Sequence, residues 1–227
     1  MNNDFIYRRK LYDRAQPHPG EQRLDFGAAP SVPLRPLDET GFTALDIETT
    51  GLSPAFCGIV EIAALKVLPG GESQTFQTLV DPHCVIPRAV TAIHGISSDM
   101  VRGAPCAEEV VGGLVEFAAG TPLVLHNAPF DLGFLTPIVQ RQGLAWRSPA
   151  VFDTLRLAKR AFPGLRSYSL ENLSRFFDFD AGNHHRALAD CEYCARLFQL
   201  IRAKLRTPDG EESFCRKCAS SPKLLGM

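Results

Sequence analysis

Two acidic side chains stand two positions apart in the segment 45–51, whose sequence is LDIETTG. Asp46 and Glu48 follow an apolar run, and residues two apart on a β-strand point to the same side. Neighbouring carboxylates on a largely apolar strand repel each other and lose solvation, and a divalent cation removes both penalties. This segment alone is compatible with a metal site and with a solvated pair of acids at a sheet edge.

A third acid, Asp131, closes the sequence HNAPFD at 126–131, directly after the apolar run PLVL at 122–125. An aspartate near the start of a helix commonly caps that helix, and for Asp131 taken alone capping is the stronger interpretation. The neighbouring Phe130 is predicted either to pack in the core or to stack on a base at the rim of a cleft.

His185 and Asp190 belong to the sequence HRALAD at 185–190, at the start of the predicted last helix. Imidazole exchanges protons near neutral pH, so a histidine here can serve as a general base in a cleft that the first helical turn also faces. His184 is a neighbouring candidate for the same role. Taken singly, a surface histidine pair and a helix-surface aspartate are the better interpretations.

The pattern of apolar residues predicts the elements that must position these side chains. Three β-prone runs come first and can pair as an antiparallel meander, at 41–47, 59–68 and 75–80. A strand at 122–125 is preceded by a helix at 108–119 and followed by helices at 128–142, 154–161, 170–177 and 186–205. The last helix is predicted to turn five side chains inward, namely Leu188, Tyr193, Leu197, Leu200 and Ile201. This order of elements indicates an α/β protein whose mixed sheet is covered on both faces.

Length and composition bound the organisation of the chain. The 227 residues are 45% hydrophobic and 22% charged, which is typical of an ordinary globular protein. No window approaches the roughly 18 apolar residues of a membrane helix, and the charged N-terminus lacks the apolar region of a signal peptide. We therefore predict a cytoplasmic protein without a membrane partner. Residues 1–36 are predicted to form an arm or linker, 37–205 one domain and 206–227 a tail.

Charge is spread unevenly over these segments. The whole chain has a net charge of −1, whereas residues 37–205 hold 14 Lys and Arg against 18 Asp and Glu. A domain that held nucleic acid through a broad basic surface should be more positive than this. If nucleic acid is the ligand, divalent metals held by carboxylates would have to meet the phosphates. The chain contains neither GxGxxG nor GxxxxGK[S/T], so dinucleotide and P-loop chemistry have no support.

In chain order the motifs are Asp-x-Glu on a first strand, Asp after a later strand and His-x4-Asp before the last helix. This ordered set resembles the DEDD-type 3′–5′ exonucleases of the histidine-containing branch, which include the epsilon (proofreading) subunit of bacterial DNA polymerase III and its stand-alone homologues. The matching segments are DIETTGL at 46–52, IHGI at 93–96, HNAPFD at 126–131 and HRALAD at 185–190. The resemblance spans about residues 40–205 and implies a ribonuclease H-like α/β fold, a mixed sheet with helices on both faces.

The resemblance also implies a metal-dependent reaction. Asp46, Glu48 and Asp190 would hold one Mg²⁺ or Mn²⁺, and Asp46 with Asp131, largely through water, would hold a second. His185 would take the proton of the attacking water. The products would be a nucleoside 5′-monophosphate and a strand one residue shorter at its 3′ end.

The same resemblance suggests substrate contacts. Thr49, Thr50 and Gly51 would approach the terminal sugar, although Gly51 is equally explained by a sharp turn. His94 would line the pocket of the terminal nucleotide, or would pack as a histidine of a surface loop. Phe56 would wedge against the last base, or would pack as an ordinary phenylalanine.

Seven cysteines, an odd number spread along the chain, indicate reduced thiols. Cys191-x2-Cys194 and Cys215-x2-Cys218 have the spacing of a four-cysteine zinc site. The first pair falls inside the predicted last helix, where at least one thiol is expected to be buried as a small apolar residue. A structural zinc at these four cysteines is therefore the less favoured prediction.

Three functions are compatible with the motifs. The favoured one is an exonuclease acting on single-stranded DNA 3′ ends in proofreading or repair, with a DNA polymerase as a candidate partner. A 3′–5′ exoribonuclease that trims RNA or short oligonucleotides would use the same residues, because contacts to the 2′-hydroxyl decide that difference. The third is a catalytically silent binding module, and the intact set of acids argues against it.

Overall fold

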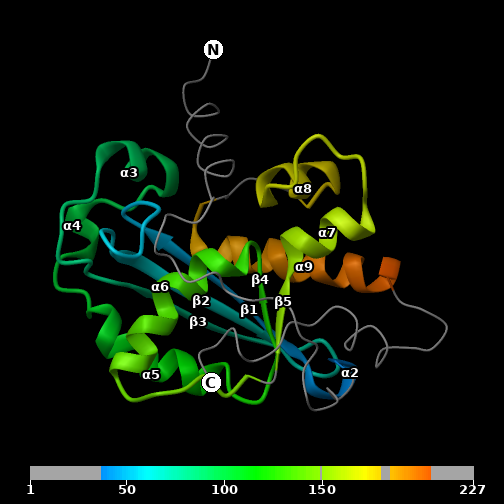
Figure 1. The fold of residues 1–227 in the computed structure, drawn as a ribbon, viewed down its shortest axis with the longest axis horizontal. Helices are drawn as coiled ribbons and strands as arrows, with labels where there is room; N and C mark the ends of the chain where they lie inside the picture. Colours follow the sequence, from blue (N-terminus) through cyan, green and yellow to red (C-terminus); the bar gives the residue numbers. More distant parts are fainter. Residues whose placement is uncertain (1–36, 149, 180–184, 206–227) are drawn as a thin grey trace.

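The computed structural model describes residues 37–148, 150–179 and 185–205, and its centre is a five-stranded sheet of order β3-β2-β1-β4-β5 (Figure 1). The strands are β1 (Phe42–Thr49), β2 (Ile59–Val67), β3 (Ser73–Leu79), β4 (Leu123–Leu125) and β5 (Val151–Asp153). The first three pair antiparallel, whereas β4 is parallel to β1 and β5 is parallel to β4. The sheet is therefore mixed, and the predicted meander is confirmed.

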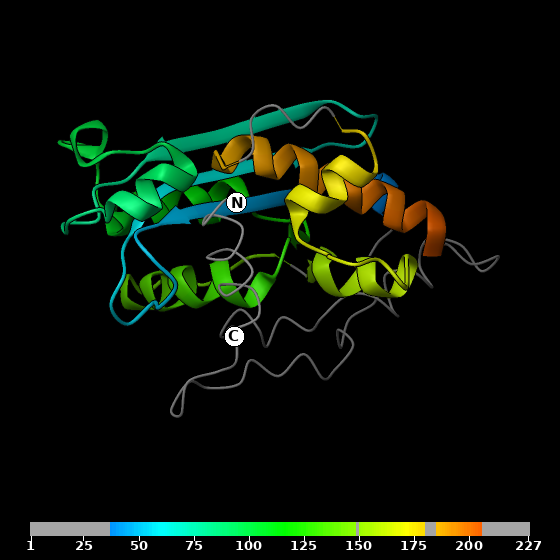
Figure 2. The same cartoon turned by 90° about the horizontal axis from the view of Figure 1, so that it is seen from above.

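Helices cover both faces of this sheet. They are α2 (Leu37–Thr40), α3 (Arg88–His94), α4 (Ser98–Val101), α5 (Ala107–Phe117), α6 (Ala128–Arg141), α7 (Thr154–Ala161), α8 (Leu170–Phe176) and α9 (Ala187–Leu205). Helix α9 lies along β1 and β2, with α7 and α8 beside it, and α5 and α6 pack on the opposite face (Figures 1 and 2). The prediction of a mixed sheet covered on both faces is confirmed.

The alternation of side chains along β1 divides the core into two layers. Phe42 and Ala44 pack with α7, α8 and α9, while Leu45 and Ile47 pack with α5 and α6. Each layer removes apolar surface from water, which is the main term that stabilises the sandwich. Because side chains alternate between faces, Asp46 continues the row of Phe42 and Ala44 toward α9.

Some predicted elements need correction. The strand β5 and the short helices α2, α3 and α4 were not predicted, because segments of three to seven residues show little periodicity. Leu200 is 38% exposed and does not face inward as predicted. Leu197 and Ile201, four residues apart, share the buried stripe of α9, and Leu200 lies at its border.

The predicted arm at 1–36 and tail at 206–227 lie outside the described residues. Within the described ranges, none of the helices combines the length and the hydrophobicity that crossing a bilayer requires.

Candidate active site

Three elements bring the predicted acids to one edge of the sheet. Asp46 and Glu48 lie near the carboxyl end of β1, and Asp131 lies in the first turn of α6, just beyond β4. Because β1 and β4 are parallel neighbours, their carboxyl ends meet at the same edge. Asp190 lies in the first turn of α9, which crosses this edge.

The closest grouping joins β1 to the start of α9. Glu48, His185 and Asp190 each offer one ligand atom, and these three atoms lie within 4.8 Å of one another. Asp131 is 3% exposed, and its Oδ1 accepts a hydrogen bond from the backbone N–H of Ile47 at 3.2 Å. This bond ties the first turn of α6 to β1, beside the two acids of that strand.

The electrostatics of the site show how close the carboxylates are. Burial, followed by the charges of Asp131, Asp190 and Glu48, raises the pKa of Asp46 well above its ordinary value. Burial and the neighbouring acids, Asp190 first, likewise raise the pKa of Glu48. The pKa of Asp131 is raised by burial, against the opposing effect of backbone hydrogen bonds. Burial and mutual repulsion therefore both disfavour the ionised forms of these carboxyl groups.

The donor set fits divalent metal ions. Carboxylate oxygens are the ligands that Mg²⁺ and Mn²⁺ prefer, and imidazole is compatible with Mn²⁺. A cation would relieve both the burial and the mutual repulsion that raise the pKa of Asp46. Glu48 and Asp190 already present their oxygens at a separation that one ion can span.

A fully buried acid of β2, Glu61, was missed by the sequence analysis. Its carboxylate accepts hydrogen bonds from Arg186 Nη2 (2.7 Å) and Nε (3.2 Å), from the Ala187 backbone N–H (3.0 Å) and from Gln77 Nε2 (2.9 Å). These bonds fasten the start of α9 to the sheet. They hold Arg186, the residue that follows His185. The backbone of His185 has a left-handed φ of 73°, which is uncommon outside glycine.

The signal for Glu61 was present in the sequence. It is a lone charge inside the apolar run IVEIAAL, and a buried charge requires a partner. What the sequence did not reveal is that the partner is Arg186, 125 positions away.

The segment between β4 and α6, the helix that carries Asp131, is anchored by His126. Its Nε2 lies 2.9 Å from the Tyr168 carbonyl and its Nδ1 lies 2.9 Å from Thr154 Oγ1. Burial lowers the pKa of His126 to about 4, so the ring is neutral. A carbonyl can only accept, so Nε2 carries the proton. The single hydroxyl hydrogen of Thr154 is then shared between the acceptor Nδ1 and the Leu125 carbonyl, 3.1 Å from Oγ1. Asp153 adds a second anchor, because its carboxylate accepts from the Asn127 N–H at 3.2 Å.

The turn after β1 is closely packed. Thr49 Oγ1 donates to the Gly51 carbonyl at 2.7 Å, and Thr50 Oγ1 accepts from the Gly58 N–H at 3.0 Å. A Cβ at Gly51 would lie 2.8 Å from Cys57 Sγ. That sulfur is the end of a side chain that can rotate away, and the φ of Gly51 lies outside the left-handed region, so neither packing nor backbone conformation requires a glycine here.

The remaining predicted substrate residues differ in exposure. Phe56 is 89% exposed, which contradicts the ordinary packed phenylalanine. His94 is only 3% exposed, which contradicts the histidine of a surface loop; burial lowers its pKa, and its Nδ1 accepts from the Ile96 N–H at 2.9 Å. Its Nε2 has no hydrogen-bond partner among the described residues. Phe130 is partly buried and packs against Phe134, with ring centroids 5.3 Å apart.

The zinc prediction finds no support in the described half of its site. Cys191 and Cys194 are buried in the α9 layer, where Cys191 Sγ donates to the Ala63 carbonyl at 3.3 Å. Burial raises the pKa of both thiols, which disfavours the thiolates that zinc requires. Cys215 and Cys218 lie outside the described residues.

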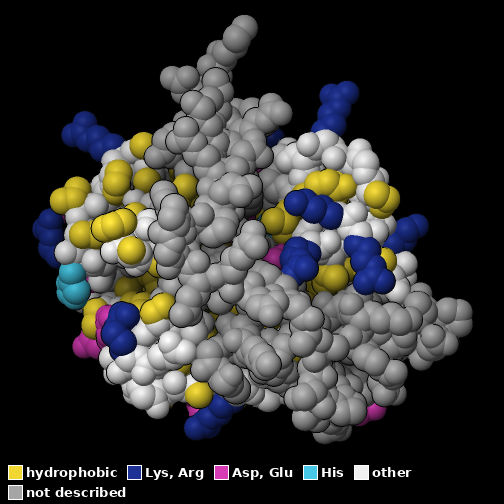
Figure 3. All heavy atoms as spheres, in the orientation of Figure 1, with side chains coloured by type: hydrophobic (Ala, Val, Ile, Leu, Met, Phe, Trp, Pro, Cys, Tyr) yellow, Lys and Arg dark blue, Asp and Glu magenta, His cyan; other side chains and the backbone are white. Residues whose placement is uncertain are grey.

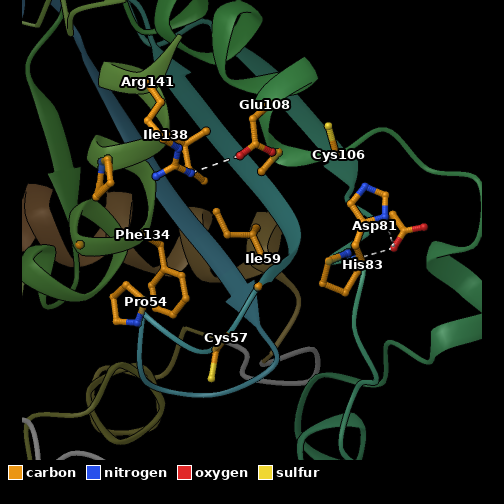
Figure 4. A pocket seen from close by; sticks show the side chains of 15 residues that line it. Pro54, Cys57, Ile59, Asp81, His83, Cys106, Glu108, Phe134, Ile138 and Arg141 are labelled. Carbon is orange, nitrogen blue, oxygen red and sulfur yellow. Dashed lines mark hydrogen bonds and ion pairs between the residues drawn. The ribbon is translucent and has the colours of Figure 1, made fainter.

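A cavity of about 280 Å³ opens on the other face, between the β1–β2 loop, α5 and α6 (Figure 4). Arg141 forms an ion pair with Glu108 at 3.2 Å in its lining, and His83 Nδ1 lies 3.6 Å from Asp81 Oδ1. The cavity contains none of the clustered acids. The clustered acids lie away from this cavity, at the sheet edge.

A ribonuclease H-like sheet whose first strand ends beside four acids and a histidine, contributed by that strand and two helices, is the arrangement of DEDD-type nucleases. Residues 43–198 match the exonuclease family (RNase_T), so the chain belongs to this family.

Curated relatives and solved structures agree with this membership. The chain is 38% identical over 162 residues to the PolC-type DNA polymerase III of Halalkalibacterium halodurans, and 39% identical over 168 residues to that of Caldanaerobacter subterraneus. The alignments cover 71% and 74% of this chain, but it spans only about a tenth of those polymerases, 11% and 12% of their lengths.

Among solved structures, exonuclease X in complex with 5′ overhanging duplex DNA is 30% identical, with a TM-score of 0.59 over 77% of this chain and 99% of that one. Escherichia coli exonuclease I in complex with a dA16 oligonucleotide shares the fold at 19% identity, with a TM-score of 0.63 over 72% of this chain and 41% of that one. The predicted family and fold are confirmed.

Proposed function

We propose that the chain removes single nucleotides from the 3′ ends of DNA at the edge where β1, α6 and α9 meet. The observation that carries this proposal is the grouping of Glu48, His185 and Asp190 within 4.8 Å, beside the buried acids Asp46 and Asp131. In a member of an exonuclease family, such a cluster is the part of the molecule able to act on a phosphodiester.

In this proposal the four acids hold two divalent ions, Mg²⁺ or Mn²⁺. Glu48 and Asp190 share one ion with Asp46, and Asp46 and Asp131 serve the second. When bound, such ions supply an activated water and charge stabilisation at the scissile phosphate. The bond from the Ile47 N–H to Asp131 fixes one of that carboxylate's oxygens, which leaves the other to face the site.

His185 is proposed as the general base. Its ring nitrogen lies within 4.8 Å of carboxylate oxygens of Glu48 and Asp190, so a water between them is within reach of the imidazole. The ion pair between Arg186 and Glu61 limits the movement of the neighbouring backbone and so orients the ring. His184, the other candidate, lies outside the described residues.

The terminal nucleotide is proposed to bind beside the turn formed by Thr49, Thr50 and Gly51. Because Nδ1 of His94 accepts a backbone N–H, its Nε2 carries a proton and is a donor for a sugar or phosphate oxygen. Phe56 offers an exposed ring for stacking on a base. Phe130 is proposed to pack behind the site, where its ring contacts Phe134.

DNA is favoured as the substrate because the relatives are PolC-type DNA polymerases and because the exonuclease X structure contains duplex DNA. The exoribonuclease and the silent binding module are the alternatives. A polymerase partner is likewise a proposal, supported by those PolC-type relatives. Residues 37–205 are proposed as the exonuclease domain, between an arm at 1–36 and a tail at 206–227.

The test compares 5′-labelled single-stranded DNA and RNA of one sequence, with Mg²⁺, with Mn²⁺ and with EDTA. We expect a metal-dependent ladder that shortens DNA from its 3′ end, absent with Asp46→Ala and present with the surface control Asp99→Ala. Faster degradation of RNA would move the protein to the exoribonuclease alternative. Degradation of neither strand with any metal would contradict the proposal and favour the binding module.

A further inference from the structure

Positive charge in this domain is concentrated in one segment. Residues 154–176, which form α7, α8 and their connection, hold five Lys and Arg against one Asp or Glu. The remainder of 37–205 holds nine Lys and Arg against 17 Asp and Glu. The segment thus has a net charge of +4 in a domain whose remainder has −8.

The geometry of α7 places three of these charges on one face. Arg156, Lys159 and Arg160 have the i, i+3, i+4 spacing of neighbours on a helix surface, and all three side chains are exposed. The opposite face, with Leu157 and Ala158, is buried in the core. Figure 3 shows Lys and Arg side chains gathered over the α7 and α8 side of the molecule.

This basic face adjoins the site. β5 pairs with β4 up to Asp153, the residue that caps α7. The same carboxylate accepts the N–H of Asn127, four residues before Asp131. Adjacent strands lie about 4.8 Å apart, so α7 begins one strand away from the start of α6, the helix that carries Asp131. Helix α8 packs on α9, the helix of Asp190.

Aromatic rings lie among these charges. Phe176, next to Arg175 at the end of α8, is 63% exposed, although other residues of that helix are buried. Lys159 Nζ lies 6.0 Å from the ring centroid of Tyr168. Cations that neutralise phosphates, next to rings on which bases stack, are the combination that binds single-stranded nucleic acid.

We propose that this surface, composed of Arg156, Lys159, Arg160, Arg166, Arg175 and Phe176 and here named the α7–α8 surface, binds the part of the substrate strand that lies 5′ to the scissile nucleotide. The cations contact successive phosphates, Arg175 by exchanging its exposed ion pair with Glu171 (2.8 Å) for a phosphate, and Phe176 stacks on a base. The inference rests on the proposed function, and it explains how a domain of net charge −4 holds a polyanion: the acids face the ions, and the phosphates upstream face α7 and α8.

The test uses the full chain and two substrates, a 20-nucleotide single-stranded DNA and the p-nitrophenyl ester of thymidine 5′-monophosphate, which has no upstream phosphate. The variant Lys159→Ala/Arg160→Ala is compared with Arg141→Ala/Arg147→Ala, which removes the same charge from exposed ion pairs beside α5 and α6. Steady-state rates with Mn²⁺ are measured at several salt concentrations.

We expect the α7 double variant to lose about tenfold in kcat/KM on the long strand at low salt, mainly through KM, and to hydrolyse the ester at the wild-type rate. The slope of log(kcat/KM) against log[salt] should become shallower by about 1.4, because each single-strand phosphate contact contributes about 0.7. Phe176→Ala should weaken binding of the long strand by about tenfold with the slope unchanged, because stacking releases no counterions. The control variant Arg141→Ala/Arg147→Ala should hydrolyse both substrates at the wild-type rate.

Equal behaviour of the α7 variant and the control pair on the long strand would overturn the α7–α8 surface while leaving the proposed function intact. If the wild type hydrolyses neither substrate, the proposed function fails separately. Fluorescence anisotropy of the labelled strand in EDTA then decides the surface by itself: weaker binding by the α7 variant alone supports it, and equal binding contradicts it.

Discussion

Glu48 and Glu61 are opposite each other in the β1–β2 ladder, yet their surroundings differ. Glu61 is fully buried, and hydrogen bonds from Arg186, from the Ala187 N–H and from Gln77 outweigh the burial that by itself raises its pKa, so that the pKa is lowered. Glu48 has other acids as its main neighbours, and burial together with their charge raises its pKa.

The difference separates two uses of a buried carboxylate. Glu61 is neutralised by the protein itself and fastens α9 to the sheet. At Glu48, burial and the charge of the neighbouring acids outweigh the opposing charge of Arg186, and a bound cation would relieve both. A buried acid whose pKa is raised by other acids is thus a better indication of function than a buried acid alone.

The largest expected effect is on exonuclease activity, and it comes from removing one of the clustered acids beside Glu48. Asp46→Asn keeps the shape of the side chain and removes a charge that both proposed ions need. We expect kcat/KM on single-stranded DNA to fall by more than about 100-fold, while the metal-free protein keeps or gains thermal stability because repulsion is relieved. Exonuclease rates and thermal unfolding in EDTA measure the two effects. A destabilised Asp46→Asn protein would contradict the electrostatic reading of the site.

Removing Glu61, the acid that is paired with Arg186, should mainly reduce the stability of the protein. Glu61→Ala leaves Arg186 without its partner and frees the start of α9, and we expect a loss of about 3 kcal/mol in the free energy of unfolding. This value is at the lower end for a buried pair, because the Arg186 side chain is 45% exposed. Urea unfolding measures the loss, with the exposed Glu72→Ala as the matched control. A change within the error of that control would contradict the structural role of Glu61.

A divalent metal ion should stabilise the protein through the clustered acids that include Asp46, and not through Glu61. At a concentration about 100 times the dissociation constant, Mn²⁺ should add about 2.7 kcal/mol to the stability of the wild type. Thermal midpoints with and without Mn²⁺ test this, and the gain should be retained in Glu72→Ala and largely lost in Asp46→Asn. A full gain in Asp46→Asn would place the bound ion elsewhere.

The two kinds of acid predict opposite dependences on pH in metal-free protein. The pKa values of Asp46, Glu48 and Asp131 are raised by folding, so their contribution to stability is complete below the ordinary pKa of a carboxyl and is lost as pH rises through the raised values. The pKa of Glu61 is lowered, so its contribution is present above the ordinary value of about 4.5 and is lost as pH falls through the lowered one.

The buried histidines His94 and His126 have lowered pKa values and add stability as pH rises, and they do so equally in both proteins. Urea unfolding in EDTA from pH 5 to pH 8 should therefore show the wild type losing stability relative to Asp46→Asn as pH rises. An identical slope in the two proteins would contradict the assignment of raised pKa values to this cluster.

The smallest effect concerns one of the four hydrogen bonds to Glu61. Gln77→Ala removes the amide donor at 2.9 Å but leaves Arg186 and the Ala187 N–H in place. We expect a loss of about 1 kcal/mol in unfolding free energy and little change in exonuclease rate. Urea unfolding and the oligonucleotide assay together test this, and a loss equal to that of Glu61→Ala would mean that the ion pair depends on Gln77.

Much of the fold could be read from local patterns. Helix α7 spans the predicted residues, and α6 and α9 each differ from prediction by one residue at one end, because amphipathic periodicity persists over enough residues to mark a helix. The three residues of β5 are too few to show such a pattern, and the parallel pairing of β5 with β4 joins segments that a helix separates in the chain.

The candidate residues were found through their types and spacing, yet their surroundings could not be. Phe56 had two interpretations until its 89% exposure excluded packing, and His94 had two until its burial excluded a surface loop. Arg186 belongs to the HRALAD motif but received no role from the sequence, because its partner Glu61 lies on β2, far away in the chain.

By itself the sequence determined the family, the order of the main elements and the identity of the acids, since these depend on residue types at short separations. Only the tertiary structure decided which acids remain unneutralised. That outcome depends on which cation the fold brings to each carboxylate, and the chain brings Arg186 across 125 positions to Glu61 while Glu48, its neighbour in the sheet, faces other acids.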